Sequence, residues 1–271
     1  MSAALSTLNP IGLDDLLERA ALQTRIDRKY VVPRPAVDHL LAELDRTTEV
    51  LEIDGIRRFT YETLYFDTPE LTSYRLTAYR RRRRFKVRTR TYVDSAQCWL
   101  EVKLPGARGS TVKHRAPYEH ADRATLAPGR CFVEQVLDGH HATAFLPTLV
   151  SRYRRSTLFL PATASRVTID TDLAWYDEHH ALHLPDLAVV ETKTTSVAST
   201  VDRRLWRLGI RPTRISKYAT ALAALRTELP APPWRRLLRR HFTPTHRSLP
   251  SPGADHLWPW KELPCVQPSV R

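Results

Sequence analysis

Glycine is scarce in this sequence, and its scarcity removes two large classes of nucleotide-binding protein. Only 8 of the 271 residues are glycine, and none of them forms a phosphate loop or a G-x-G-x-x-G run. Both motifs need several glycines, because backbone N–H groups must approach the phosphates closely. A P-loop site and a Rossmann-type dinucleotide site are therefore excluded.

Cysteine and long apolar runs are also rare. The three cysteines, Cys98, Cys131 and Cys265, are far apart and show no C-x-x-C spacing, which argues against a disulfide framework or a zinc site. No apolar run approaches the ~20 residues of a membrane span. The first 13 residues lack the basic and apolar regions of a signal peptide. We therefore expect a cytoplasmic protein in a reducing compartment.

Positive charge, by contrast, is abundant. Lysine and arginine number 42 against 29 acidic residues, a net charge of +13. This balance favours nucleic acid, an acidic lipid surface or a phosphorylated substrate as partner, without choosing among them.

The last 41 residues differ in character from the rest. Residues 231–271 hold eight of the 20 prolines, with seven basic residues against two acids. We therefore predict a globular domain over residues 1–230 and a proline-rich basic tail over residues 231–271. Within the tail, Trp234–Phe242 has the pattern of a short basic amphipathic helix, so a membrane surface or a membrane-protein partner is a candidate ligand of the tail.

The most informative stretch lies between Arg84 and Lys103, which is typical of two strands joined by a turn. Basic residues alternate with apolar or β-branched residues along it. Side chains of a strand alternate between faces with period two, so one face is cationic and the other apolar. The basic residues of the first strand are Arg84, Lys86, Arg88 and Arg90, and Glu101 and Lys103 follow in the second.

The same alternation returns around Lys113, Arg155, Arg166 and Lys193. Like charges on neighbouring strands destabilise a sheet, so a sheet with this repeated pattern needs a counter-charge, which a polyanion would supply. The alternative is a charged face that only meets water. Against it, few acidic residues share the pattern, chiefly Glu101 and Glu191.

The remaining periodicities predict several helices between or after these strands, and hence an α+β fold. Helical spacing occurs from Ile11 to Leu22, after Pro35, from Thr68 to Tyr79 and, with a break at Pro128–Gly129, from Arg123 to Leu137. Two further helices are predicted at Val201–Leu208 and from Ser216 to Leu229. The five arginines Arg80–Arg84 are typical of a solvated arm.

Eight short pieces of the sequence, in order and spacing, resemble the VTC-type polyphosphate polymerase domain, a member of the triphosphate tunnel metalloenzymes (CYTH-like superfamily). The resemblance covers roughly residues 10–228. The pieces are Ala21–Tyr30, Tyr65–Pro69, Phe85–Arg90, Leu100–Lys103, Val112–Arg115, Arg166 before Asp170, Val190–Lys193 and Ser216–Tyr218.

The resemblance implies a closed antiparallel β-barrel tunnel of about eight strands, with cationic walls and with helices packed outside. It also implies transfer of the γ-phosphate of ATP onto a growing inorganic polyphosphate chain, with Mn²⁺ or Mg²⁺ as cofactor. ATP and polyphosphate or phosphate would be the partners, and a specific nucleic-acid ligand is not expected.

The resemblance also assigns roles to individual residues. Lys29 is similar to the phosphate ligand of the first strand, Arg88 and Arg90 to paired tunnel arginines, and Arg214 replaces an expected lysine. The other expected catalytic residues are Lys103, Lys113, Tyr153, Arg155, Arg166, Lys193 and Lys217. Arg115, Arg214 and Ser216 are expected to bind the phosphates, and Glu191 and Glu101 the metal.

Each assignment has a plainer alternative. Glu191 could only pair with a neighbouring cation, Tyr153 could be a core aromatic residue, and Lys217 could be a solvated helix residue. Asp67 and Asp170 are interpreted as structural. The sequence also departs from the hydrolytic relatives, which carry E-x-E-x-K where this chain has arginine at position 25 and Asp27 before Lys29.

Three hypotheses remain open. The first is an ATP-dependent polyphosphate polymerase, for which an anionic acceptor makes a strong general base unnecessary. The second is a tunnel-type triphosphatase or cyclase that acts on a small triphosphate. The third is a non-catalytic module that binds polyphosphate or another polyanion, because aromatic and basic residues interleave around Arg80–Tyr92.

Overall fold

A computed structural model gives the fold over most of the chain. It describes residues 2–20, 26–107, 110–138, 144–195, 197–242 and 247–248. The predicted pieces at residues 21–25 and most of the basic tail lie outside these residues.

One sheet of 12 strands organises the described chain. Its main path follows the order β12-β10-β9-β8-β4-β5-β6-β7, while β11 joins β9 to β2 and β3 joins β8 to β1. All pairs are antiparallel except β1 with β3. The strands are β1 (Asn9–Ile11), β2 (Ile26–Pro33), β3 (Glu49–Leu51), β4 (Phe59–Asp67), β5 (Lys86–Tyr92), β6 (Gln97–Pro105), β7 (Thr111–Tyr118), β8 (Leu146–Leu160), β9 (Ser165–Tyr176), β10 (Ala181–Leu184), β11 (Leu187–Thr194) and β12 (Arg247–Ser248).

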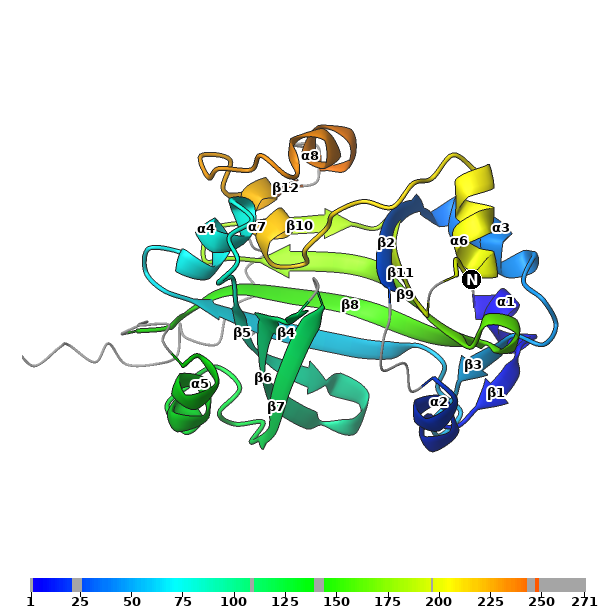
Figure 1. Cartoon of the computed structure of the whole chain (residues 1–271), viewed down its shortest axis with the longest axis horizontal. Helices are drawn as coiled ribbons and strands as arrows, with labels where there is room; N and C mark the ends of the chain where they lie inside the picture. Colours follow the sequence, from blue (N-terminus) through cyan, green and yellow to red (C-terminus); the bar gives the residue numbers. More distant parts are fainter. Residues whose placement is uncertain are drawn as a thin grey trace, which may run out of the picture.

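The sheet is not closed, so the predicted barrel is wrong. Within the described chain, β7 pairs only with β6 and β2 only with β11, and no ladder joins these two ends. The long strands β4, β8 and β9 run along the length of the molecule, whereas β7 lies steeply across their direction (Figure 1). Part of the free edge of β2 is covered by a non-helical segment, where the N–H of Thr213 donates to the carbonyl of Lys29 at 2.7 Å.

The helices flank the sheet, and most of them are shorter than the sequence predicted, whereas α6 has the predicted length. The predicted helix from Arg123 to Leu137 forms only beyond its expected break at Pro128 and Gly129. The helices are α1 (Ser2–Ser6), α2 (Leu13–Arg19), α3 (Arg34–Ala42), α4 (Thr72–Ala78), α5 (Arg130–Val136), α6 (Thr200–Arg207), α7 (Ala219–Leu225) and α8 (Arg235–His241), with short 3₁₀ turns at Val93–Ser95 and Pro161–Thr163.

The apolar face of the sheet is covered in two places. Val167, Ile169 and Val190 are buried in a core cluster that includes residues of α3 and α6. Val87 and Val102 are buried in a second cluster, which includes a residue of α5. These residues occupy alternate strand positions, as a period-two pattern requires. The opposite face is thereby left for the charged side chains.

A third core cluster closes one end of the charged face. All seven residues of α7 are buried, and α7 packs with Tyr65 of β4, Tyr153 of β8 and Val189 of β11. Trp234 and Leu237 belong to the same cluster, so α8 packs onto the rest of the chain although it lies in the predicted tail. Figure 1 shows α4, α7 and α8 on the same side of the sheet.

Candidate functional site: the cationic face

Strand register brings the predicted basic residues onto one face. From β4 outward, Tyr65 lies opposite Arg88, Arg88 opposite Glu101, and Glu101 opposite Arg115. Residues directly opposite each other on neighbouring strands share a face. We call the strand residues that share this face, together with Ser216 and Lys217 before α7, the cationic face. Its charged strand residues are Asp27, Lys29, Lys86, Arg88, Arg90, Glu101, Lys103, Lys113, Arg115, Arg155, Arg166, Asp170, Glu191 and Lys193.

The first ion-pair group on this face centres on Glu101. Arg88 Nε donates to its Oε2 at 2.7 Å, and Lys113 Nζ lies 3.6 Å from its Oε1. The side chains of Arg88 and Glu101 are almost fully buried. Burial alone would raise the pKa of Glu101, but Arg88, Arg90, Lys103 and Lys113 hold that pKa well below its usual range. Glu101 is therefore a buried carboxylate that partly neutralises the arginine pair.

The second group centres on Asp170 of β9. Arg155 donates to its two oxygens at 2.6 and 2.8 Å, and Lys217 also donates to Oδ2. Burial opposes ionisation, but Arg155 and Lys217 lower the pKa of Asp170. Asp170, interpreted from the sequence as structural only, lies within β9 and fixes the side chains of Arg155 and Lys217, two of the expected catalytic residues. Lys217 is not a solvated helix residue: it precedes α7 and forms a buried pair.

Tyr153 lies between these groups. Its ring is buried and stacks on Tyr61 with centroids 5.3 Å apart, while Lys217 Nζ lies 4.5 Å from its centroid. Its hydroxyl has no hydrogen-bond partner among the described residues. Burial would raise the pKa of Tyr153, but Arg90, Arg155 and Lys217 together lower it. Tyr153 is therefore both a core aromatic residue and a hydroxyl surrounded by cations.

The third group contains Glu191 of β11. Lys193 Nζ lies 3.7 Å from its Oε1, and Lys29 is its Cα partner on β2. Despite burial, the charges of Lys29 and Lys193 hold the pKa of Glu191 well below its usual range. Glu191 does pair with a neighbouring cation, as the plainer interpretation of the sequence held, and it is ionised on the cationic face.

Three lysines of the face lack such a partner. Within the described chain, Lys29, Lys86 and Lys103 form no ion pair with a carboxylate. Burial and the charges of Lys29, Arg88 and Arg84 lower the pKa of Lys86 to about 7. Arg88 and burial lower the pKa of Lys103. The face therefore carries positive charge that the protein itself leaves uncompensated.

Two predicted residues stand apart from this buried centre. Arg115 is exposed and its guanidinium lies 4.6 Å from the ring centroid of Trp99, and Arg214 is exposed. Sequence reasoning in turn passed over Lys86 and Asp170 as site residues. The period-two pattern does place Lys86 on the cationic face, so Lys86 could have been predicted as a site residue from the sequence.

Asp67 was interpreted from the sequence as structural, and its carboxylate is hydrogen-bonded within the fold. Its oxygens accept N–H bonds from Thr68, Ser73 and Tyr74 at 2.8 to 2.9 Å, and the Tyr218 hydroxyl also donates to it. The contacts join the start of α4 to the segment before α7.

The cationic face offers carboxylate ligands to a metal ion, but the described residues do not form a complete set of protein ligands. No group of three or more His, Cys, Asp or Glu side chains in the described residues could hold a metal. Glu191 is ionised, and Oε1 of Glu101 is buried without a hydrogen bond among these residues. Mg²⁺ commonly binds through one or two carboxylates together with substrate phosphates. The donor set fits an ion shared with phosphate.

The sequence profile of the VTC domain matches residues 24–226. The chain belongs to the VTC domain family. The matched region contains every predicted site residue from Lys29 to Lys217. A search of curated proteins gave no match.

Solved structures with distant similarity were also found. One is described as a candidate adenylate cyclase from Vibrio parahaemolyticus (14% identity, 74% of this chain and 99% of that chain, TM-score 0.44). Another, from Hippeastrum, is described as a candidate adenylyl cyclase with a dominant triphosphatase activity (15% identity, 73% and 94%, TM-score 0.46). At these scores the similarity carries no argument about function.

The described chain contains no helix that is long and apolar enough to cross a membrane.

Proposed function

We propose that this VTC domain protein is a polyphosphate polymerase that transfers the γ-phosphate of ATP to the end of an inorganic polyphosphate chain. The observation that carries the proposal is the surplus of buried and half-buried cations on one face of the sheet, within the region that matches the family. Arginine and lysine donors fixed before the substrate arrives are well suited to phosphoryl transfer, which depends on positioning and charge neutralisation.

In the proposed reaction, a terminal phosphate oxygen of the chain attacks the γ-phosphorus of ATP. A new P–O bond forms, the bond to the β–γ bridging oxygen breaks, and ADP leaves with that oxygen. Because the attacking oxygen is already anionic, no residue has to remove a proton from it. Arg88, Arg90 and Arg155 would hold phosphate oxygens in fixed directions, since arginine binds them in a forked geometry.

Glu191, together with phosphate oxygens, would hold the Mn²⁺ or Mg²⁺ ion. Bound there, the ion would supply further positive charge to the transferred group. Lys193 and Lys29 keep the Glu191 carboxylate ionised, and this is the form that binds a cation.

The test is incubation of the purified protein with ATP and Mn²⁺ or Mg²⁺, followed by gel analysis of chain length and measurement of ADP. Long acid-labile chains with ADP are expected. Orthophosphate or pyrophosphate without long chains would instead indicate a triphosphatase or a cyclase.

The variant Glu191→Gln separates catalysis from binding. It should lose chain synthesis yet still bind tripolyphosphate, whereas the exposed-site control Glu178→Gln should behave as wild type. If Glu191→Gln and wild type are equal in every assay, a non-catalytic binding module is the better description.

A further inference from the structure

Lys86 occupies a position on the cationic face to which no role has been assigned above. It begins β5, with Lys103 as its Cα partner on β6 and Lys113 opposite Lys103 on β7. Its ammonium donates to Ser216 Oγ at 3.1 Å, across the face and just before α7. A lysine ammonium has three N–H donors, so two remain beyond this contact.

Ser216 is arranged as a donor on the same side. Its Oγ accepts from Lys86 and from the N–H of Ala219, at 3.1 Å each, so both lone pairs of the hydroxyl are used. Its O–H has no acceptor among the described residues. The side chain is buried, with 8% of the residue exposed. Lys86 and Ser216 therefore present donors that still need an acceptor.

The surrounding charge shows what kind of acceptor is missing. Arg88, Arg155 and Lys193 each face a carboxylate on a neighbouring strand or on their own strand. Lys86 faces other cations instead: burial and the charges of Lys29, Arg88 and Arg84 lower its pKa. Crowded cations with no carboxylate are costly unless an anion joins them. The missing acceptor is an anion with several oxygens.

We propose that Lys86 is a further phosphate-binding residue, which completes with Ser216, already expected to bind phosphate, a subsite at the α7 end of the cationic face, with Lys29 and Lys103 beside it. Its occupant is one phosphate group of a condensed phosphate chain. The identity of that occupant rests on the proposed function, whereas the donor arrangement does not. Lys86 is a binding residue in this view, and Ser216 both donates to the phosphate and positions the ammonium.

The test measures the binding of inorganic tripolyphosphate by calorimetry, without ATP or metal. Lys86→Met keeps the aliphatic stem and removes the charge. It should weaken binding by about tenfold or more, the effect of one lost charge-assisted hydrogen bond. Arg82→Met removes an equal charge from an exposed position and should change binding by less than about twofold.

A purely structural role for the Lys86–Ser216 contact predicts a different pattern. Lys86→Met would then lower the melting temperature of the ligand-free protein and leave tripolyphosphate affinity equal to that of wild type, which would overturn the subsite. We expect the reverse: an unchanged or higher melting temperature, because an uncompensated cation is gone, together with weaker binding. Ser216→Ala should weaken binding too, and Lys86→Arg should restore part of it.

Failure of the proposed function would look different. If wild type binds tripolyphosphate in a Lys86-dependent way but makes no polymer from ATP, the subsite stands and the polymerase proposal falls. If wild type does not bind tripolyphosphate at all, the subsite is rejected.

Discussion

At the scale of single residues, Glu101 has two opposing effects. Its carboxylate neutralises Arg88 and Lys113, which stabilises the folded protein without ligand. The same carboxylate repels phosphate. On a face proposed to bind a polyanion, this carboxylate would stabilise the ligand-free protein at a cost in anion affinity.

We predict that Glu101→Gln separates these effects. Removing one partner of a buried pair leaves the Arg88 charge uncompensated, so the free energy of unfolding should fall by about 3 kcal/mol. Tripolyphosphate should then stabilise the variant more than it stabilises wild type. Urea unfolding with and without the ligand measures both.

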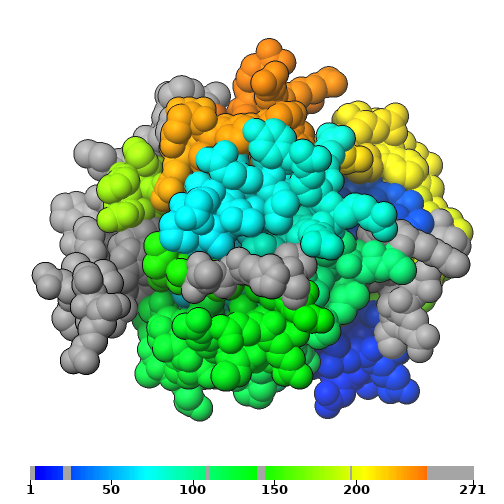
Figure 2. Space-filling view, turned by 60° about the vertical axis from the view of Figure 1, so that its left-hand side comes forward, coloured from blue at the N-terminus to red at the C-terminus, as the bar shows by residue number. Residues whose placement is uncertain are grey.

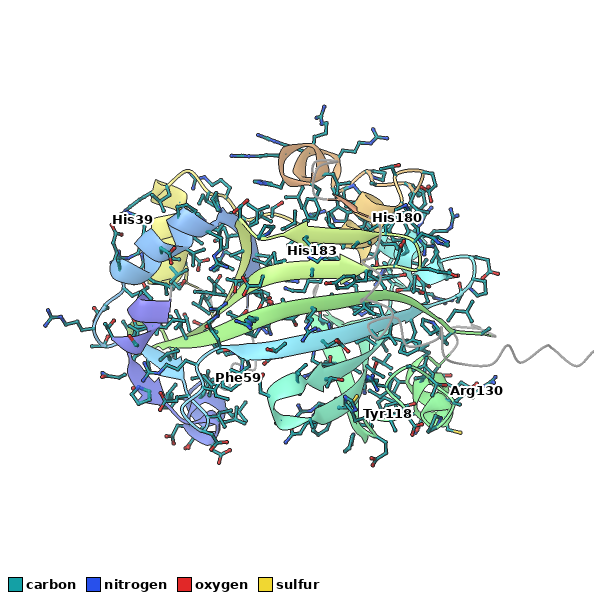
Figure 3. All side chains as sticks on the ribbon, turned by 180° about the vertical axis from the view of Figure 1, so that it is seen from behind. His39, Phe59, Tyr118, Arg130, His180 and His183 are labelled. Carbon is teal, nitrogen blue, oxygen red and sulfur yellow. The ribbon has the colours of Figure 1, made fainter. Side chains whose placement is uncertain are left out.

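Glu134→Gln provides the matched control. Glu134 pairs with Arg130 at 2.6 Å on the exposed surface of α5, and Figure 3 shows Arg130 on that helix. This substitution should change neither quantity appreciably. Equal effects of the two substitutions would contradict the role given to Glu101.

A pH dependence follows from Lys86. Burial and the charges of Lys29 of β2 and of Arg88 and Arg84 of its own segment lower the pKa of Lys86 to about 7, and Lys103 of β6 is its Cα partner. Below pH about 7 Lys86 is already protonated in the free protein. Above it, Lys86 must take up a proton before its ammonium can bind phosphate. The contribution of Lys86 to anion affinity is therefore complete below pH about 6 and declines as the pH rises through about 7.

The measurement compares wild type with Lys86→Met, since ionisation of the ligand itself affects both. The ratio of their tripolyphosphate affinities should shrink by about tenfold between pH about 6 and about 8.5. A constant ratio over that range would show that Lys86 stays charged in the free protein.

The period-two pattern predicted which residues lie on the cationic face, but not which side chains contact each other. The alternation along Arg84–Lys103 and its repeats correctly placed Arg88, Glu101 and Lys113 on one face. Lys217 and Asp170, however, are 47 positions apart, and their contact depends on how the segment before α7 crosses the sheet. No local pattern contains that information, so Asp170 was assigned only a structural role.

At the scale of elements, the helices show where tertiary contacts override local propensity. The predicted helix from Ser216 to Leu229 is only Ala219–Leu225 in the structure. Ser216 accepts the N–H of Ala219, and Arg226 at the other end pairs with Asp177. Both ends are thus set by side chains whose partners could not be foreseen from the spacing of apolar residues.

Asp67 links two helical elements, and Asp67→Asn should loosen both. An amide presents one acceptor oxygen where the carboxylate presents two, so N–H donors of α4 or the Tyr218 hydroxyl lose their partner. We expect the free energy of unfolding to fall by about 2 kcal/mol or more, with faster amide exchange in α4 and α7. Tyr218→Phe, which removes one of the four contacts, should cost less, and a larger loss than in Asp67→Asn would contradict this order.

At the scale of the whole molecule, the error in the predicted fold concerns closure. The facing of the charged residues followed from local pattern, but the resemblance implied about eight strands and the sheet has 12. Closure requires in addition that the two end strands meet. Here β2 and β7 do not pair, and the segment containing Thr213 uses a carbonyl of β2. The family resemblance suggested the closed form, whereas the hydrogen bonds of this chain define an open, strongly twisted sheet.

The predicted partner of the basic tail can now be tested with point variants instead of deletion. Arg235, Arg236, Arg239 and Arg240 of α8 are exposed, whereas Trp234 and Leu237 are buried. Figure 2 shows α8 (orange) protruding from the surface above α4 (cyan), and side chains with nitrogen ends extend outward from α8 in Figure 3. Deleting residues 231–271 would expose the core, so loss of binding in that variant would be ambiguous.

We predict that replacing these four arginines with serine weakens binding to vesicles rich in phosphatidylglycerol, since each basic residue near an acidic surface contributes about 1 kcal/mol. Replacing the exposed Arg80, Arg81, Arg82 and Arg83 with serine removes the same charge elsewhere and should have a smaller effect. Co-sedimentation measures both. Equal losses would mean that net charge, and not α8, governs the interaction.

One of the outer strands of the open sheet is β7, whose exposed side chains include Lys113, His114 and Arg115, with Pro117 near its end. Outer strands of this kind can recruit the same strand of another molecule, and lysine, arginine and proline are the residues that discourage it. The basic groups proposed to bind phosphate would thus also keep copies of the protein apart. A long phosphate chain that neutralises them would remove this repulsion, so the ligand would set both the occupancy of the face and the tendency of the protein to self-associate.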